Sequence, residues 1–280
     1  MQRALSRNFA GNSNSLRSDY PLTDDQIFRV APSIFAQEPH ESRSERYAYI
    51  PTIDVLNGLR KEGFEPFAVV QSRCRLEGKS EFTKHMIRMR HANNILADQA
   101  NEIILLNSHD GTSSYQMLAG CFRFVCQNGM VAGDIIEDLR IGHRGDVMNN
   151  VIEGAYEVLH GFERVDESRE CMMQTRLSHE EQAVFARSAL MLRYDTQDPG
   201  KAPIRPDQLL MPKRRSDQGN DLWSTFNVVQ ENALKGGLRG RTANNSRTTT
   251  RAVTGISQDL KLNQALWALA EGMRQLKAAA

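Results

Sequence analysis

The chain has 280 residues, of which 25% are charged and 40% are hydrophobic, and its formal net charge is +1. This composition is typical of a globular protein with a sizeable core and argues against a globally disordered chain. Because the net charge is almost zero, binding to a polyanion such as nucleic acid would require a local basic patch.

The sequence has no pattern of a secretory signal, of a membrane span or of paired cysteines. The first twenty residues contain arginine but no apolar core of a secretory signal, and no run of 18 apolar residues could span a membrane. The four cysteines show neither C-x-x-C spacing nor a paired framework, which indicates free thiols in a reducing compartment: Cys74, Cys121, Cys126 and Cys171. We therefore expect a cytoplasmic protein with no membrane partner.

Residues 1–50 form the first of three predicted regions and lead into the fold. Residues 1–20 are rich in Asn, Ser and Arg, and we expect them to form a mobile arm. Thr52 then has the position of an N-cap for a helix over residues 53–62, and Gly63 follows where the helix would end. The lead-in is thus expected to be turn-rich until this first helix.

The second region, residues 51–145, has the period-two hydrophobic pattern of β-structure after that helix. Four runs with the pattern of strands follow one another: Phe67–Leu76, Phe82–His91, Asn101–Asn107 and Tyr115–Asn128. A glycine-containing link joins the first two runs, and the Asp110-Gly111 pair is a turn signal between the last two. The sequence predicts an α+β fold in which helices pack on an antiparallel sheet of about four strands.

The third region, residues 146–280, has the periodicity of helices. Ser178 and Glu181 have the spacing of a capping box that opens a helix, and a proline-broken polar stretch over residues 195–221 is predicted to be an exposed linker. A helix beginning near Leu222 ends at two glycines, and a basic loop over residues 235–257 precedes the last helix. We expect the two tryptophans of these helices to lie in the core.

The basic loop is the strongest candidate for a functional site. No acidic residue occurs between Asn232 and Gln258, and this stretch carries five cations: Lys235, Arg239, Arg241, Arg247 and Arg251. The residues between the arginines are mainly Gly, Asn, Ser and Thr, which are flexible and offer hydrogen bonds. Such a loop is suited to nucleic-acid phosphate. The alternative is a solvated loop whose arginines pair with nearby carboxylates.

A second candidate is one face of the predicted hairpin. Five cations alternate along its two strands and would line a basic surface: Arg73, Arg75, Lys84, Arg88 and Arg90. A sheet surface of this kind can follow a phosphate backbone. The alternative is an ordinary solvent-facing side of the sheet.

A third candidate is the adjacent pair His109 and Asp110, which suggests a metal-dependent or acid–base site. The remaining histidines have no spacing typical of metal ligands. A structural turn in which Asp110 bonds its own backbone explains this pair better, so no metal and no cofactor are predicted.

Three segments together resemble a known family. They read NSHDGTSSYQMLAGCFRFVCQNGM, LWSTFNVVQENALKGG and TRAVTGISQDLKLNQALWALAE. In this order they are similar to the phage- and plasmid-borne bacterial family called "domain of unknown function 932", over roughly residues 51–271. The family's association with prophages and conjugative plasmids implies a DNA-centred role, but it supplies no catalytic residues. The order of strands and helices also has a loose analogy to single-strand annealing proteins.

We therefore expect a non-catalytic nucleic-acid-binding protein of a bacterial mobile element, with single-stranded DNA as its partner in recombination or DNA maintenance. The two basic regions would supply the affinity through release of counterions. Two alternatives stay open: a metal-dependent nucleic-acid or nucleotide enzyme centred on His109 and Asp110, and a protein that blocks a host defence complex. The sequence also leaves a homo-oligomer open.

Overall fold

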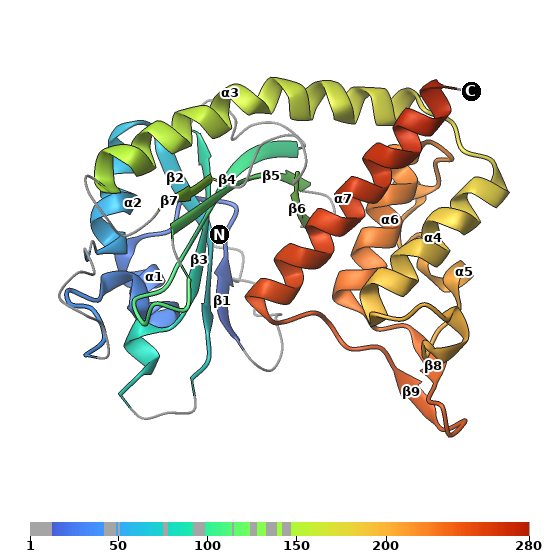
Figure 1. The fold of residues 1–280 in the computed structure, drawn as a ribbon, viewed down its shortest axis with the longest axis horizontal. Helices are drawn as coiled ribbons and strands as arrows, with labels where there is room; N and C mark the ends of the chain where they lie inside the picture. The colour runs from blue at the N-terminus through green and yellow to red at the C-terminus, as the bar shows by residue number, and fades with distance from the viewer. Residues whose placement is uncertain are drawn as a thin grey trace, which may run out of the picture. The chain divides into compact units, whose positions relative to one another are not determined.

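The computed structural model describes residues 13–41, 49, 51–74, 78–91, 99–113, 115–123, 128–132, 139–141 and 147–279. The chain divides into two compact units (Figure 1). Unit 1 comprises Met1–Gly129, Ile136–Phe162 and Thr254–Ile256. Unit 2 comprises Met130–Ile135, Glu163–Val253 and Ser257–Ala280.

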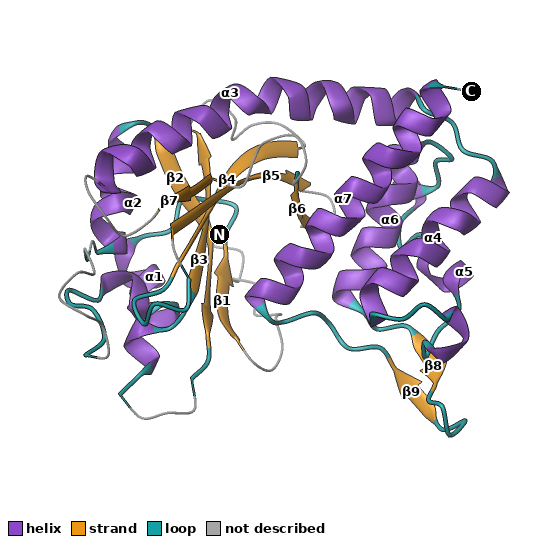
Figure 2. Cartoon of the chain, viewed as in Figure 1, coloured by secondary structure: helices purple, strands orange, loops and turns teal. Residues whose placement is uncertain are grey.

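The sheet that dominates unit 1 has the strand order β1-β2-β3-β4-β5-β6, with β7 paired to β5 (Figure 2). Its strands are β1 Ser13–Arg17, β2 Phe64–Ser72, β3 His85–His91, β4 Gln99–Asn107, β5 Tyr115–Arg123, β6 Asn128–Val131 and β7 Leu139–Ile141. The pairs β1–β2, β2–β3, β3–β4, β4–β5 and β5–β7 are antiparallel. The α+β class is thus confirmed, although the described residues form a sheet of seven strands where the pattern predicts about four.

The additional strand at the start of the sheet corrects one expectation. Five residues of the segment predicted as a mobile arm form β1, which pairs along β2 with Leu16 opposite Val69. Asn is depleted in strands, but an edge strand pairs with a neighbour along only one of its edges, so polar residues are tolerated there. Residues 1–12 of the predicted arm lie outside the described residues.

Among the described residues of unit 1, the sheet is accompanied by the helices α1 Asp24–Val30 and α2 Thr52–Lys61, the first part of α3 Val147–Gln174, and the short 3-10 segments Pro32–Phe35 and Ser80–Phe82. Helix α2 buries Val55, Leu56 and Leu59 at helical spacing, which explains why it forms where the pattern predicts. The predicted cap is wrong, because Pro51 is the N-cap and Thr52 is already helical. The Thr52 side chain is fully buried and bonds other groups instead.

Unit 2 contains helices and one small two-stranded sheet. Its elements are the second part of α3, α4 His179–Tyr194, α5 Pro206–Leu209, α6 Leu222–Lys235, β8 Arg239–Arg241, β9 Arg247–Thr249 and α7 Ile256–Ala278. Helix α6 is the core of the unit, since every residue from Leu222 to Ala233 except Ser224 is buried. Trp223 and Trp267 pack edge to face with ring centroids 6.3 Å apart, which confirms their place in the core.

The ends of the unit 2 helices follow the predicted signals. Ser178 and Glu181 form the expected capping box of α4, with Glu181 N donating to Ser178 Oγ. Helix α6 ends at two glycines, and Gly236 has φ 63°, where a Cβ would lie 2.7 Å from the Thr250 carbonyl oxygen. Only glycine fits such a close approach in this conformation, so the chain can turn directly into β8.

The stretch over residues 195–221 is more ordered than the predicted exposed linker. It contains α5 and 3-10 turns at Pro199–Lys201 and Arg215–Asp217. Ile204, Leu209 and Asp217 are at most 5% exposed. Prolines fix the backbone angle φ, so they can define short helical turns as readily as they interrupt long helices.

The two longest helices are α3, with 28 residues, and α7, with 23 residues. On α7, Leu262 and Leu266 are buried, whereas Leu276 is 70% exposed near the end of the helix. Among the residues that the structure describes, no helix combines the length and hydropathy needed to cross a membrane.

Candidate nucleic-acid interface

The predicted basic loop folds as a β-hairpin in unit 2. Strands β8 and β9 pair antiparallel, with Arg239 opposite Thr249 and Arg241 opposite Arg247. The turn closes where Thr242 N donates to Ser246 O at 2.9 Å, and Asn245 adopts the left-handed conformation with φ 60°. Asn tolerates this conformation better than most residues, so the Asn-rich tip suits a tight turn.

The hairpin is held against α5 and the segment that precedes it. Arg241 N donates to Pro203 O at 2.8 Å, and Gln208 Nε2 donates to Arg239 O at 2.8 Å. A Cβ at Gly240 would lie 1.9 Å from Pro203 O, so the backbones approach closely at this point. These contacts have no signal in the sequence pattern of residues 203–208, although the glycine between two arginines is a signal for close backbone contact.

Substituting Gly240→Ala is therefore expected to displace the hairpin without any change of charge. A strain of 1–2 kcal/mol would raise the population of the displaced hairpin by roughly tenfold. Limited trypsin digestion with mass spectrometry should show faster cleavage after Arg239 and Arg241. The matched control is Gly272→Ala, since a Cβ at Gly272 meets nothing within 4 Å. Equal cleavage rates in both variants would show that Gly240 does not fix the hairpin.

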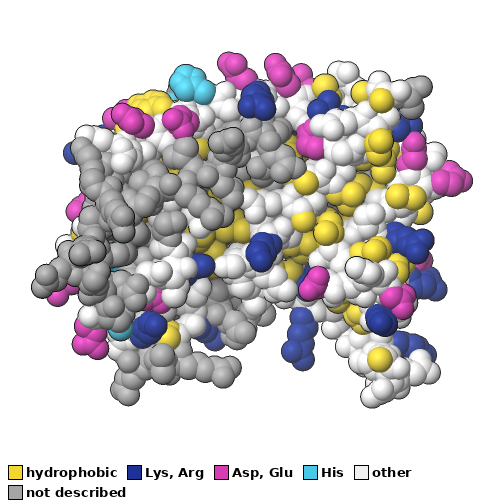
Figure 3. Space-filling view, viewed as in Figure 1, with side chains coloured by type: hydrophobic (Ala, Val, Ile, Leu, Met, Phe, Trp, Pro, Cys, Tyr) yellow, Lys and Arg dark blue, Asp and Glu magenta, His cyan; other side chains and the backbone are white. Residues whose placement is uncertain are grey.

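The exposed face of the hairpin concentrates arginine. Arg239 and Arg241 are two residues apart on β8, and Arg247 faces Arg241 on β9, so all three side chains share one face of the ribbon and are exposed. Arg251, just beyond β9, is also exposed. We call these four residues the arginine hairpin. Figure 3 shows dark blue side chains at the lower right edge, where Figure 1 places β8 and β9.

The arginine hairpin is not neutralised by acids of its own segment. Like charges directly opposite on paired strands are destabilising, and Arg241 and Arg247 have this arrangement. Arg241 Nη1 donates to both the carbonyl and the side-chain oxygen of Asn245 at 3.0 Å. These bonds orient one guanidinium while its other nitrogen atoms remain for an external acceptor. An anionic ligand would relieve the repulsion.

Lys235, the fifth predicted cation, has a different environment. Its Nζ lies 3.1 Å from Glu231 Oε1, and Arg214 binds the same carboxylate with two bonds of 2.8 Å. Burial opposes ionisation of Glu231, but the bonds from Arg214 and the charge of Lys235 lower its pKa to about 2. The charge of Lys235 is thus balanced inside unit 2, and it is separate from the arginine hairpin.

The predicted basic face of the β2–β3 hairpin is wrong for two of its residues. The antiparallel pairing is as expected, but Arg88 and Arg90 are only 2% and 1% exposed. Both donate to Glu102, at 2.9 and 2.8 Å, and the Arg90 guanidinium lies 4.4 and 4.2 Å from the ring centroids of Phe67 and Phe122. Strand β3 lies between β2 and β4, and here both faces of the sheet are buried.

The other three predicted cations of that face do not lie within the described parts of strands β2 and β3. Arg73 is exposed and follows the end of β2, whereas Lys84 is half-buried and precedes the start of β3. Arg75 lies outside the described residues. The alternating pattern identifies the strands correctly, but it does not distinguish a solvent-facing side from a buried ion-pair layer.

His109 and a second histidine, His85, belong to a buried hydrogen-bond network in unit 1. Both are fully buried, with ring centroids 5.2 Å apart. Because the Thr83 carbonyl can only accept, His85 Nδ1, at 3.2 Å, carries the hydrogen. His85 Nε2 then accepts from Thr52 Oγ1 at 2.9 Å. Burial and the neighbouring His109 lower the pKa of His85 to about 3, so this imidazole is neutral.

The Thr52 hydroxyl also determines the protonation of His109. Since Thr52 donates to His85, it accepts from Asn107 Nδ2 at 3.0 Å and from His109 Nε2 at 3.3 Å. His109 therefore carries its hydrogen on Nε2 in this network. Complete burial and the bond to Thr52 support a structural role of His109 and leave no access for a substrate in this conformation.

Asp110 forms the structural turn that the sequence suggests. Its Oδ1 accepts from Thr112 N at 3.0 Å and from Thr112 Oγ1 at 2.6 Å. Burial alone would raise its pKa, but these bonds, a bond from Ser108 and the charge of Lys79 together lower it. Within the described ranges, no group of three or more His, Cys, Asp or Glu side chains could hold a metal ion. The pair is thus part of the turn between β4 and β5.

Comparison with known proteins shows which family this chain belongs to. A family described as "Domain of unknown function (DUF932)" matches residues 39–267. The chain is 51% identical to the UPF0380 protein YafZ of Escherichia coli (strain K12) over 273 residues, 98% of each chain. It is 52% identical to the UPF0380 protein YfjQ of the same organism over 271 residues, 97% of each chain. No solved structure matches it. The chain belongs to the DUF932 family.

Proposed function

We propose that this protein binds nucleic acid through the arginine hairpin, with single-stranded DNA as the preferred partner, as a non-catalytic component of recombination or DNA maintenance on a mobile element. The observation that carries the proposal is the cluster of exposed arginines on one face of an anchored ribbon, in a segment without any acid from Asn232 to Gln258.

The physical argument concerns both charge and geometry. Guanidinium groups bind phosphate with two parallel hydrogen bonds, and the docked ribbon holds its arginines in a fixed order. Arg239 and Arg241 are successive residues on one strand face, so they can contact successive phosphates along a backbone. The Asn, Ser and Thr residues of the tip offer further donors for sugar and phosphate oxygens. Binding would release counterions and relieve the repulsion between opposed arginines.

The test is binding of labelled single-stranded and double-stranded oligonucleotides by the full chain across a salt series. Four phosphate contacts on a single strand predict a slope of log affinity against log salt of roughly −2.8. Changing Arg239, Arg241, Arg247 and Arg251 to Ala together should reduce affinity at low salt by at least about tenfold and flatten the slope towards zero.

A matched control removes four exposed cations from other elements: Arg29, Lys61, Arg187 and Lys261. This variant has the same net charge as the hairpin variant, so it should keep most of the affinity and slope if the hairpin is the site. An equal loss in both variants would indicate non-specific attraction. Absence of binding at low salt would contradict the proposal and favour an acidic protein partner, which capture from nuclease-treated host lysate could then identify.

A further inference from the structure

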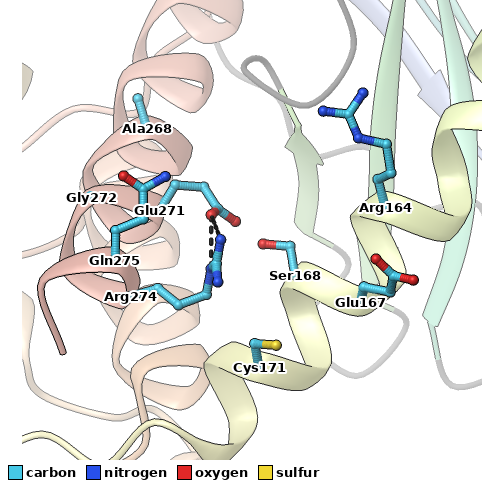
Figure 4. A pocket seen from close by; sticks show the side chains of 9 residues that line it. All are labelled: Arg164, Glu167, Ser168, Cys171, Ala268, Glu271, Gly272, Arg274 and Gln275. Carbon is cyan, nitrogen blue, oxygen red and sulfur yellow. Dashed lines mark hydrogen bonds and ion pairs between the residues drawn. The ribbon is translucent and has the colours of Figure 1, made fainter. Parts of the chain in front are cut away.

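Unit 2 contains a cleft between the second part of α3 and α7, separate from the arginine hairpin. Its volume is about 430 Å³, within the usual range of small-molecule sites. The α3 wall carries Arg164, Ser168 and Cys171, and the α7 wall carries Glu271 and Gly272 (Figure 4). Nothing in the proposed nucleic-acid function uses this cleft.

Two buried oxygen atoms at the cleft have no hydrogen-bond partner among the described residues: Ser168 Oγ and Glu271 Oε1. Ser168 is 6% exposed and Glu271 is 7% exposed. Figure 4 shows both side chains directed into the space between the two helices, from opposite walls. Buried polar atoms are normally satisfied, so a carboxylate oxygen facing a hydroxyl indicates a position for a hydrogen-bond donor.

The wall of the cleft also contains a glycine that the helix itself does not require. Gly272 lies in the interior of α7, where glycine costs roughly 0.5–1 kcal/mol relative to alanine. A Cβ at this position would meet nothing within 4 Å. No neighbouring group therefore demands a glycine, and only a side chain larger than a methyl group would reach across the cleft from this position.

Charged side chains line both walls of the cleft. Glu271 Oε2 accepts from Arg274, with Nε at 2.9 Å, which leaves Oε1 to face the cleft. On the α3 wall Arg164 is exposed and has no ion pair with a carboxylate in the described part of the chain. Both walls carry both signs of charge, since Glu167 lies on the α3 wall and Arg274 on the α7 wall. However, the α7 wall offers the Glu271 Oε1 acceptor to a cation, and the α3 wall offers the Arg164 guanidinium to an acid.

We propose that this cleft binds a small zwitterion of the free amino-acid class. The ammonium group of the ligand would donate to Glu271 Oε1 and Ser168 Oγ, and its carboxylate would bind Arg164. An ammonium supplies three donors, which matches two acceptors on opposite walls. Charge-assisted bonds in a partly enclosed site are stronger than bonds between neutral groups, so both ends of the ligand contribute.

Alkylation of Cys171 in the full chain provides the test, because this exposed free thiol lines the cleft. The probes are the twenty common L-amino acids, each added before N-ethylmaleimide, with peptide mass spectrometry as the readout. At a concentration ten times its Kd, a bound amino acid should slow labelling of Cys171 by about tenfold. Labelling of Cys74, a half-buried cysteine in unit 1, should not change.

Two variants at one position separate binding from folding. Gly272→Leu should fill the cleft and abolish the protection, whereas Gly272→Ala should keep it, and both residues favour the helix more than glycine. Propylamine and propionate carry one charge each and should protect weakly. The proposal is overturned if no amino acid protects Cys171, if either single-charge compound protects equally, or if protection persists in Gly272→Leu.

Discussion

Replacing Glu102 with Gln is expected to lower the free energy of unfolding by about 3–5 kcal/mol. Glu102 is fully buried, and each of its carboxylate oxygens binds one buried arginine, Arg88 at 2.9 Å and Arg90 at 2.8 Å. The neutral amide keeps the shape of the side chain but removes the negative charge that balances two guanidinium groups. Urea unfolding followed by far-ultraviolet circular dichroism would measure the loss.

The control for this substitution is Glu65→Gln. Glu65 lies 3.7 Å from Arg60 and is about one-third exposed, so its ion pair is screened by solvent. Exposed pairs of this kind contribute at most about 1 kcal/mol. If Glu102→Gln destabilised the protein no more than Glu65→Gln, the buried ion-pair layer would not be a major source of stability.

Lowering the pH from 7 to 5 is expected to reduce the free energy of unfolding by about 2 kcal/mol through His85 alone. The folded pKa of this buried imidazole is about 3, against 6.5 for the exposed group. Below pH 6.5 the unfolded chain therefore takes up a proton that the folded chain does not. The stabilisation is complete above this pH and is lost progressively as the pH falls towards 3.

Urea unfolding at pH 7 and pH 5 would measure this effect in the wild type and in His85→Gln. The variant should be less stable at pH 7, because it disturbs the bonds to Thr52 and Thr83, but its further loss at pH 5 should be about 2 kcal/mol smaller. His160→Gln serves as the control, since His160 is exposed on α3. Equal pH dependence of all three proteins would exclude His85 as the source.

The elements of the fold are largely predictable because local patterns determine them. The alternating runs at β2 and β3 and the glycine link between them suffice to identify a hairpin. The capping box at Ser178 and the two glycines after α6 mark helix ends by local hydrogen bonding and backbone conformation. None of these features depends on distant parts of the chain.

Burial of polar residues is not predictable in the same way. Arg88 and Arg90 have the spacing of a solvent-facing strand side, and only their contact with Glu102 on β4 shows that this side is buried. Thr52 likewise has the position of a helix cap, but its hydroxyl bonds to two histidines, one in β3 and one in the loop after β4. Such partners come together only through the strand order of the sheet.

Part of the candidate site is predictable from the sequence, and part of it is not. The arginines of the basic loop are predictable from composition, because an acid-free segment rich in glycine and polar residues favours exposure. Pro203 and Gln208, which hold the hairpin, lie more than thirty residues before it in the chain. Because their stretch is rich in prolines, its sequence resembles a linker. The sequence therefore indicates the charge of the site, whereas its rigidity follows from the tertiary structure.

The position of the tryptophans has a spectroscopic consequence. The chain contains only two, Trp223 and Trp267, and both lie in unit 2, packed together with Phe226. Indole emission excited at the red edge of the absorption band therefore reports on unit 2 alone, whereas Glu102 and His85 belong to unit 1. If the emission midpoint of Glu102→Gln stayed at the wild-type value while its dichroism midpoint fell, the two units would melt as separate cooperative blocks.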